Sequence, residues 1–217
     1  MILRRVAAEA LGTCFLLISV IASGIMGVNL AGGNVAIALL ANAIATGCML
    51  FVIITTLGPI SGAHFNPAVS FAFFLRGALP MRDFAGFVLA QCAGGILGVW
   101  AAHLMFGLPL LQTSQTLHRT GGAQWFSEGI ATFGLLFVIF GGLRSRAEAV
   151  PMLVAVYITG AYWFTSSTSF ANPAVTRARG FSDTFAGIYP GHIAMFVGVQ
   201  FLTVIVAHPL LKALFDD

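Results

Sequence analysis

Six long apolar segments constrain this chain more than any other feature of its sequence. The clearest of them, FAGFVLAQCAGGILGVWAAHLMF, contains no Asp, Glu, Lys or Arg. A helix needs about 20 apolar residues to cross the hydrocarbon core of a bilayer, and five further segments meet this condition. Together they predict an all-α membrane protein with spans at residues 6–27, 34–57, 84–106, 125–143, 150–167 and 189–211.

The composition supports the same class. Charged residues make up only 8% of the 217 residues, whereas a water-soluble domain carries roughly 25%, so lipid must be the solvent of this chain. The net charge of +3 comes from few groups and does not suggest a nucleic-acid partner. No nucleophile–base pair, phosphate loop or metal cluster stands out, and a lone His64 does not predict a metal site. We therefore expect neither an enzyme nor a bound cofactor.

Basic residues in the loops predict the orientation in the membrane, because cytoplasmic loops carry the excess of Lys and Arg. With the N-terminus inside, three arginines fall on the outer side. More basic residues fall on the inner side, namely Arg4, Arg5, Arg76, Arg82, Arg144, Arg146 and Lys212. This distribution places both termini in the cytoplasm.

One polar motif occurs twice in this apolar background. SGAHFNPAVS starts at residue 61 and TSFANPAVTR starts at residue 168. Asn is a favoured N-cap, and Pro is favoured at the first helical position, where its missing N–H is not needed. Each stretch starts a helix of about 10 residues, which is too short to span a bilayer and fits a re-entrant half-helix. The motif residues are Asn66, Pro67, Ala68, Asn172, Pro173 and Ala174.

The two halves of the chain resemble each other. EALGT starts at Glu9 and EGIAT starts at Glu128, each early in the first span of its half. Three spans per half is an odd number, so the second half must run upside down relative to the first. We expect a single domain over 1–217 with inverted repeats at about 1–107 and 120–217, in which the half-helices enter from opposite sides and meet near the midplane.

Three polar residues are candidates for supporting the two re-entrant loops. Glu9 and Glu128 cost free energy in a membrane span, so a role for them is expected. We expect their carboxylates to accept hydrogen bonds from the loop backbone; a proton relay is the alternative. His64, two residues before the first motif, is expected to fix its loop and border the pore.

These twin motifs, the SGAHFNPAVS loop and the paired glutamates resemble the aquaporin, or major intrinsic protein, family. The resemblance covers almost the whole chain. It implies six transmembrane helices plus two re-entrant half-helices, one pore per protomer, and a homotetramer embedded in lipid, here the bacterial inner membrane. It also implies passive conduction of small neutral solutes.

The family has a narrow filter made by four side chains. Carried over by spacing from the motifs, these positions fall on Thr46, Gly160, Ser169 and Val175. Water-selective members usually have Phe, His, a small residue and Arg there, and glycerol channels usually have Trp, Gly, Phe and Arg. The resemblance therefore implies a wide filter that lacks arginine, similar to bacterial aquaglyceroporin-like channels associated with arsenic handling. The implied solutes are glycerol, arsenite as its neutral hydroxide, methylated arsenicals and water.

Arg179 offers a displaced positive charge. It lies four residues after Val175, so it falls on nearly the same helix face, and it could line the outer vestibule. The alternative is an interfacial arginine that reaches water or headgroups. Arg177 should point away from the pathway.

Three rival functions fit parts of the pattern. A mainly water-conducting aquaporin would share the fold. A secondary transporter also uses inverted repeats and broken helices, but only the two glutamates could couple it to ions. An anion channel would need a stronger positive site than these half-helices supply.

Overall fold

The computed structural model describes residues 2–216 as helices joined by loops, with no strand among them. Six of the helical segments are long and apolar enough to cross a membrane, as the sequence predicts. A 3-10 turn precedes α6 and another precedes α8. The helices are α1 (Ile2–Leu30), α2 (Val35–Ser61), α3 (Pro67–Leu75), α4 (Met81–Met105), α5 (Gly122–Ser145), α6 (Val150–Phe164), α7 (Pro173–Arg179) and α8 (Ile193–Phe215).

Several helices extend beyond the predicted spans, for local reasons. The second span was expected to end before Pro59, but α2 passes this proline and ends at Ser61. Gly62 then closes the helix in the left-handed conformation (φ 96°), and its N–H donates to the carbonyl of Gly58. Only glycine adopts this conformation freely. The fifth span is shorter than predicted, because α6 ends at Phe164 and the chain becomes extended at Thr165.

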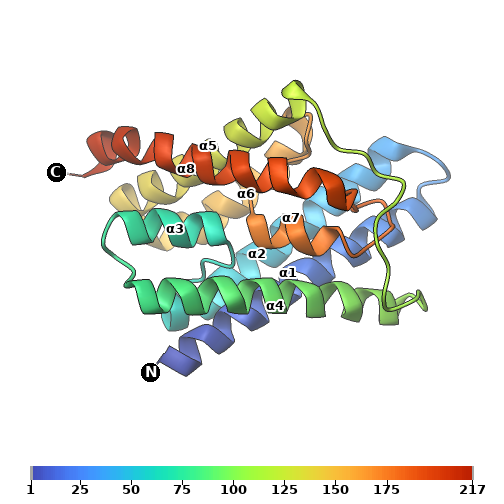
Figure 1. The fold of residues 1–217 in the computed structure, drawn as a ribbon, viewed down its shortest axis with the longest axis horizontal. Coiled ribbons are helices and arrows are strands. Elements are labelled where there is room, and N and C mark those ends of the chain that lie inside the picture. Colours follow the sequence, from blue (N-terminus) through green and yellow to red (C-terminus); the bar gives the residue numbers. More distant parts are fainter. Residues whose placement is uncertain (1, 217) are drawn as a thin grey trace.

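The two short helices lie in the middle of the bundle (Figure 1). There, α3 and α7 follow one another nearly end to end, with α8 on one side and α4 on the other. In the first half α1 packs against α2 and α4; in the second half α5 packs against α6 and α8, and α2 also contacts α6. Buried apolar residues from all eight helices form one continuous core.

Small residues allow the closest of these contacts, between α1 and α4. A Cβ atom built on Gly94 would collide with the carbonyl oxygen of Ala10, and one built on Gly98 would collide with that of Cys14. Small residues at membrane helix contacts let backbones approach in this way. The outer face carries exposed large apolar residues such as Leu89 (72%), which lipid can cover.

Both ends of the chain lie at the same end of the bundle (Figure 1). Two ion pairs also lie at the ends of its helices. Arg5 at the start of α1 pairs with Asp83 at the start of α4, and Arg76 after α3 pairs with Asp216 after α8.

Candidate functional site

The site is built on the first residues of the two half-helices. Asn66 is in extended conformation, and its side-chain oxygen accepts from the backbone N–H of Ala68 (2.8 Å). Asn172 does the same for α7, accepting from the N–H of Ala174 (3.0 Å). Each asparagine therefore caps its own half-helix, with a proline in the first helical turn.

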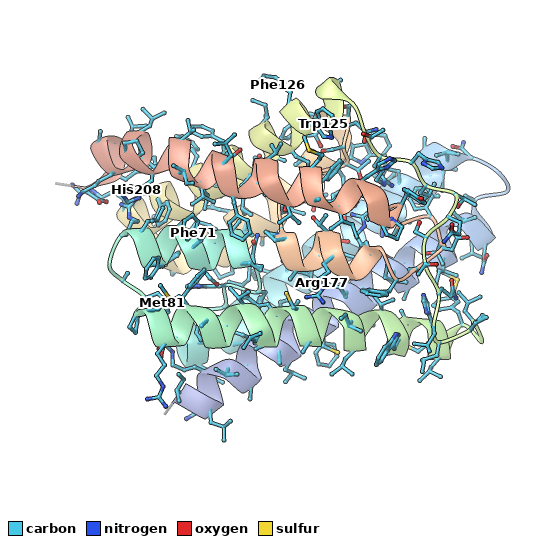
Figure 2. All side chains as sticks on the ribbon, viewed as in Figure 1. Phe71, Met81, Trp125, Phe126, Arg177 and His208 are labelled. Carbon is cyan, nitrogen blue, oxygen red and sulfur yellow. The ribbon has the colours of Figure 1, made fainter. Side chains whose placement is uncertain are left out.

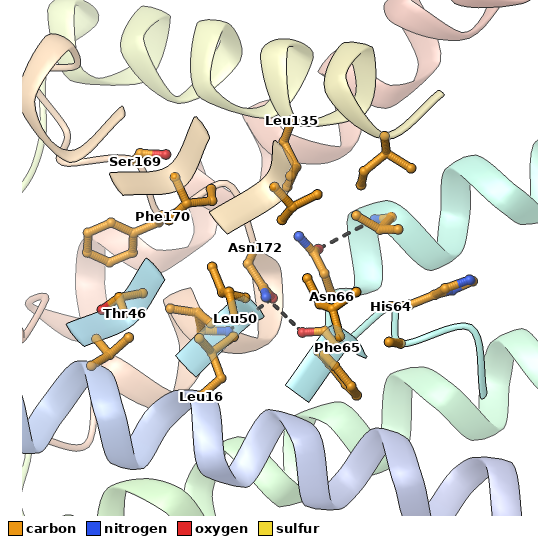
Figure 3. Close-up of a pocket in the computed structure, with 18 of the residues that line it drawn as sticks. Leu16, Thr46, Leu50, His64, Phe65, Asn66, Leu135, Ser169, Phe170 and Asn172 are labelled. Atoms are coloured by element: carbon orange, nitrogen blue, oxygen red, sulfur yellow. Dashed lines mark hydrogen bonds between the residues drawn. The ribbon is translucent and has the colours of Figure 1, made fainter. Parts of the chain in front are cut away.

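The same two asparagines also bind across the inverted halves. The Asn66 side-chain amide donates to the carbonyl of Ala171, and the Asn172 amide donates to the carbonyl of Phe65, both at 2.8 Å. Figure 3 shows the two side chains facing each other beside a cavity. A side-chain amide has two N–H groups, so each asparagine keeps one donor after this bond.

The segments before the asparagines have unusual backbone conformations. All positive-φ residues other than glycine among residues 2–216 lie in these two segments: Ala63, Phe65, Thr168, Ser169 and Ala171. Such residues cost free energy and persist only where their surroundings hold them. A dense set of hydrogen bonds to two buried glutamates provides that hold.

Glu9 accepts hydrogen bonds from the first of these segments. Its carboxylate accepts from the backbone N–H groups of His64 (3.0 Å) and Phe65 (2.6 Å). The Ser61 hydroxyl (2.6 Å) and the Gln91 side-chain amide (2.8 Å) also donate to it. The carboxylate has no solvent exposure.

Glu128 has the equivalent arrangement in the second half. It accepts from the backbone N–H groups of Phe170 (2.8 Å) and Ala171 (2.9 Å) and from the Gln200 side-chain amide (2.7 Å). Gln200 also donates to the Thr176 hydroxyl at 3.0 Å.

The sequence reading missed both glutamines. Gln91 also donates to the Ser70 hydroxyl, at 3.0 Å, so it matches Gln200 in this respect as well. Each lies in an otherwise apolar stretch of a span, and this isolated side-chain amide is the signal that could have found them; in the structure both are fully buried.

His64 lies at one side of the cavity. Its ring nitrogen Nδ1 is 3.1 Å from the Ser70 hydroxyl, and its ring centre lies 4.5 Å from that of Phe73, with the two rings tilted by 30°. The side chain lines the cavity. Within residues 2–216, no three His, Cys, Asp or Glu side chains gather where they could hold a metal ion.

The cavity has a volume of about 90 Å³. The two asparagines lie in its middle, between His64 on one side and Thr46 and Ser169 on the other (Figure 3). Most of the wall between these polar groups is aliphatic, with Leu16 and Leu50 among its members. It is therefore a largely apolar passage with polar groups at a few positions.

Three of the four residues predicted by spacing for the filter line this cavity: Thr46, Ser169 and Val175. The hydroxyl of Thr46 is 3.3 Å from that of Tyr162. The hydroxyl of Ser169 is buried without a protein partner.

The fourth residue, Gly160, does not line this cavity. Gly160 is exposed on the outside of α6 and is not among the cavity-lining residues. Ile158 and Tyr162, four residues apart on one face of α6, line the cavity instead. Two residues turn a helix by roughly 200°, so Gly160 faces away. The connection from α6 to Asn172 is thus two residues shorter than the spacing rule assumed.

Arg179 is almost completely buried (2% exposed) and lines the cavity, as does Val175 one turn before it. Its Nε–H donates to the carbonyl of Ala186. The guanidinium carbon lies 3.4 Å from the centre of the Phe170 ring, within the range of a cation–π interaction. Arg177, in contrast, is exposed and turned away from the cavity.

A second arginine contacts the same ring and was not found from the sequence. Arg119, in the loop between α4 and α5, has its guanidinium carbon 5.2 Å from the centre of the Phe170 ring. Its Nε–H donates to the carbonyl of Gly187 at 3.0 Å. Burial lowers the pKa of Arg119 from its ordinary value, but a guanidinium stays protonated in proteins. Two positive charges therefore lie near this end of the cavity.

Comparisons with known proteins show which family this chain is similar to. The family model "Major intrinsic protein" matches residues 1–165. Aquaglyceroporin AqpS of Rhizobium meliloti (strain 1021) is 56% identical over 209 residues, which is 96% of this chain and 89% of that protein. Aquaporin NIP1-1 of Zea mays is 38% identical over 168 residues, 73% of this chain and 58% of that protein.

A solved structure shares the fold. The aquaglyceroporin from Plasmodium falciparum aligns with a TM-score of 0.71 at 18% identity, covering 98% of this chain and 100% of that one. At this identity the match concerns the fold alone.

Proposed function

The chain belongs to the major intrinsic protein family, and on this basis we propose that it conducts small uncharged polar solutes passively through the cavity beside Asn66 and Asn172. Family membership supports an integral membrane channel. The relative from Rhizobium meliloti is named an aquaglyceroporin, which supports glycerol and water as solutes here.

The observation that carries the proposal is the crossed pair of asparagine bonds. Asn66 and Asn172 each donate one N–H to the other half of the protein, and the second N–H remains for a solute oxygen. The aliphatic wall offers no competing partner, so a hydroxyl group or a water passes by exchanging hydrogen bonds at a few fixed points. An ion would lose its hydration there without adequate replacement.

We propose a filter at the end of the cavity that carries Arg179. Thr46 and Tyr162 would form one side, and Ser169 and Val175 the other. This filter differs from the wide, uncharged one expected from spacing, because Tyr162 takes the place assigned to Gly160 and Arg179 supplies a positive charge. Ser169 and Thr46, which both line the cavity, support contact with polyhydroxy solutes.

The solutes beyond water and glycerol form the finer part of this proposal. Arsenite as its neutral hydroxide has three hydroxyl groups, and methylated arsenicals retain some of them, so the same donors and acceptors suit them. A mainly water-conducting channel is the second candidate, and the bulk of Tyr162 next to Thr46 favours it.

The pathway can be tested with a matched pair of substitutions on α6. Ile158 lines the cavity, whereas Val156 is 61% exposed on the outside of the same helix. In liposomes followed by stopped-flow light scattering, Ile158→Trp should reduce water and glycerol flux strongly, and Val156→Trp should leave both near wild type. Equal behaviour of the two variants would contradict the proposed pathway.

The same liposomes separate a channel from its rivals. A channel should give a flux proportional to the gradient, for glycerol and, by metal analysis, for arsenite. A flux that saturates or follows a proton gradient would indicate a transporter. Electrical conductance in planar bilayers would indicate an ion channel.

We also propose that both termini are cytoplasmic, in a bacterial inner membrane, and that the protein is a homotetramer. The excess of basic residues on the side of the two termini, most of them in internal loops, supports the orientation. Protease accessibility of a C-terminal tag in inside-out vesicles tests the orientation, and mass measurement in detergent tests the assembly.

A further inference from the structure

An apolar groove lies on the outside of the bundle, on the side of the two half-helices that faces away from the cavity. Its volume is about 580 Å³. Val88 of α4 and Val197 of α8 line it from two sides, and Pro67 and Pro173 belong to its lining as well. In Figure 2 this region faces the viewer, between α8 and α4. The groove is separate from the cavity that contains the asparagine side chains, because the two share no lining residue.

Arg177 is the one charged residue that lines this groove. It is exposed, and Figure 2 shows it on α7, on the side that faces α4. Its backbone carbonyl accepts a hydrogen bond from the N–H of Gly180, but among residues 2–216 no group forms a hydrogen bond, an ion pair or a ring contact with its guanidinium. Its neighbour Arg179 points into the channel cavity instead. The half-helix α7 thus presents Arg179 to the channel cavity and Arg177 to the groove.

A charge in this position requires a partner, because a cation surrounded by apolar side chains and lipid is expensive. The guanidinium group binds a phosphate through two parallel N–H···O bonds. Thr113, on the loop side of the groove, adds a second polar group. Its oxygen accepts from the Gln115 side chain at 2.8 Å, which leaves its own O–H free to donate.

We propose that this groove binds an anionic glycerophospholipid. The phosphate lies on Arg177 and near the Thr113 hydroxyl, and an acyl chain lies along the apolar lining toward Phe201. This ligand matches both halves of the site: a negative headgroup for the one cation, and a hydrocarbon chain for the apolar groove.

A second copy of this chain fits the groove less well, because most of its acids are buried or already paired. Glu9 and Glu128 are fully buried, and Asp83 and Asp216 are in ion pairs. Asp183 accepts three hydrogen bonds from Gln115 and Thr116 of the loop between α4 and α5. Among the acids that the structure describes, the remaining one is Glu148, beside the start of α6. The charge on Arg177 therefore favours lipid over a protein neighbour.

Cys92 allows the lipid to be detected directly, since its thiol lines the groove. The purified full-length chain in detergent is alkylated with N-ethylmaleimide, and modification of Cys92 is followed by mass spectrometry. Cys48 is exposed on α2, outside the groove, and serves as an internal control. The probes are dioleoylphosphatidylglycerol and dioleoylphosphatidylcholine, which share their acyl chains, and inorganic phosphate.

Phosphatidylglycerol should slow the alkylation of Cys92 but not of Cys48, and phosphatidylcholine should do so only at a higher concentration. Arg177→Gln should raise the phosphatidylglycerol concentration needed by about fivefold, the usual effect of one basic residue on anionic lipid. Arg177→Lys should keep most of the protection. Arg82→Gln removes an exposed arginine at the start of α4, outside the groove, and should behave as wild type.

A variant that keeps the charge tests the apolar half of the site. Ala194 is exposed in the groove lining, so Ala194→Trp should fill the groove and abolish the protection by lipid. Three results would overturn the proposal: equal protection by the two lipids in wild type, unchanged protection in Arg177→Gln, or protection by inorganic phosphate alone. The last result would indicate a simple anion site.

Discussion

The guanidinium carbon of Arg179 lies 3.4 Å from the centre of the Phe170 ring, at one end of the channel cavity. Phe170 immediately precedes Ala171, whose carbonyl binds Asn66, and its own N–H is bound to Glu128. The arginine is therefore held by the same rigid segment that places the asparagines. A fixed positive charge beside a narrow passage raises the barrier to protons and cations.

Replacing Arg179 by Gln should weaken this barrier. We expect proton leak and glycerol permeability to increase several-fold, because the charge is removed and the side chain is shorter. Proton flux can be measured with a pH-sensitive dye inside liposomes, and glycerol flux by light scattering. Arg179→Lys keeps the charge and should leak less than the Gln variant. If Arg179→Gln leaves both permeabilities unchanged, the charge has no role in selectivity.

The carboxylate of Glu9 should matter for stability. It accepts four hydrogen bonds in a fully buried place. In Glu9→Gln, the NH2 group of the amide would replace one carboxylate oxygen and face N–H and O–H groups that have no other acceptor. We expect a loss of about 3 kcal/mol, seen as a fall in the thermal unfolding midpoint of roughly 10 °C in detergent.

The same experiment discriminates the two roles considered for this glutamate. A proton relay would predict a normal unfolding midpoint and altered proton flux in Glu9→Gln. Thr56→Val is a suitable control, since Thr56 is exposed on α2 and bonds only to its own helix.

Local signals in the sequence were enough to predict the start of both half-helices. An Asn followed by Pro determines a helix N-terminus within a few residues, and both α3 and α7 begin there. The six spans were also predictable, because their hydropathy is a property of the segment itself. The ends of helices were harder to predict. Pro59 was expected to lie beyond the end of the second span, but α2 continues through it to Ser61.

Contacts between distant segments could not be read in this way. Counting back from Asn172 selected Gly160 instead of Tyr162, because residue spacing does not reveal the path of the connecting loop. Arg119 reaches the Phe170 ring from a loop far away in the sequence, and no local pattern marks it. Gln91 required knowledge of which span lies beside Glu9.

Tyr162 should limit the width of the channel. Its side chain lines the cavity, with its hydroxyl 3.3 Å from that of Thr46 on the same side, so Tyr162→Gly should raise glycerol permeability several-fold, and more than it raises water permeability. Gly160→Ala, on the outside of the same helix, is the matched control and should change neither. A clear effect of Gly160→Ala, with none for Tyr162→Gly, would restore the assignment based on spacing.

The loop that carries Arg119 should loosen in acid. Asp183 accepts the backbone N–H groups of Gln115 (2.9 Å) and Thr116 (3.1 Å), and the bond from Gln115 is the main cause that lowers the pKa of Asp183 below its ordinary 3.8. The unfolded chain thus binds this proton more readily than the folded one. The stabilisation is present above pH 3.8 and is lost as the pH falls through the lower folded-state pKa.

Amide hydrogen exchange at Gln115 and Thr116 can measure this loss. After correction for intrinsic rates, protection of both amides should fall as the pH is lowered below 3.8, while amides of the buried helices stay protected. Asp183→Asn cannot ionise, so its protection at these amides should be weaker at neutral pH and should not change over this range. A wild-type profile that is flat below pH 3.8 would mean that the charge on Asp183 does not hold the loop, and that the remaining bonds, such as that from Arg119 to Gly187, are sufficient.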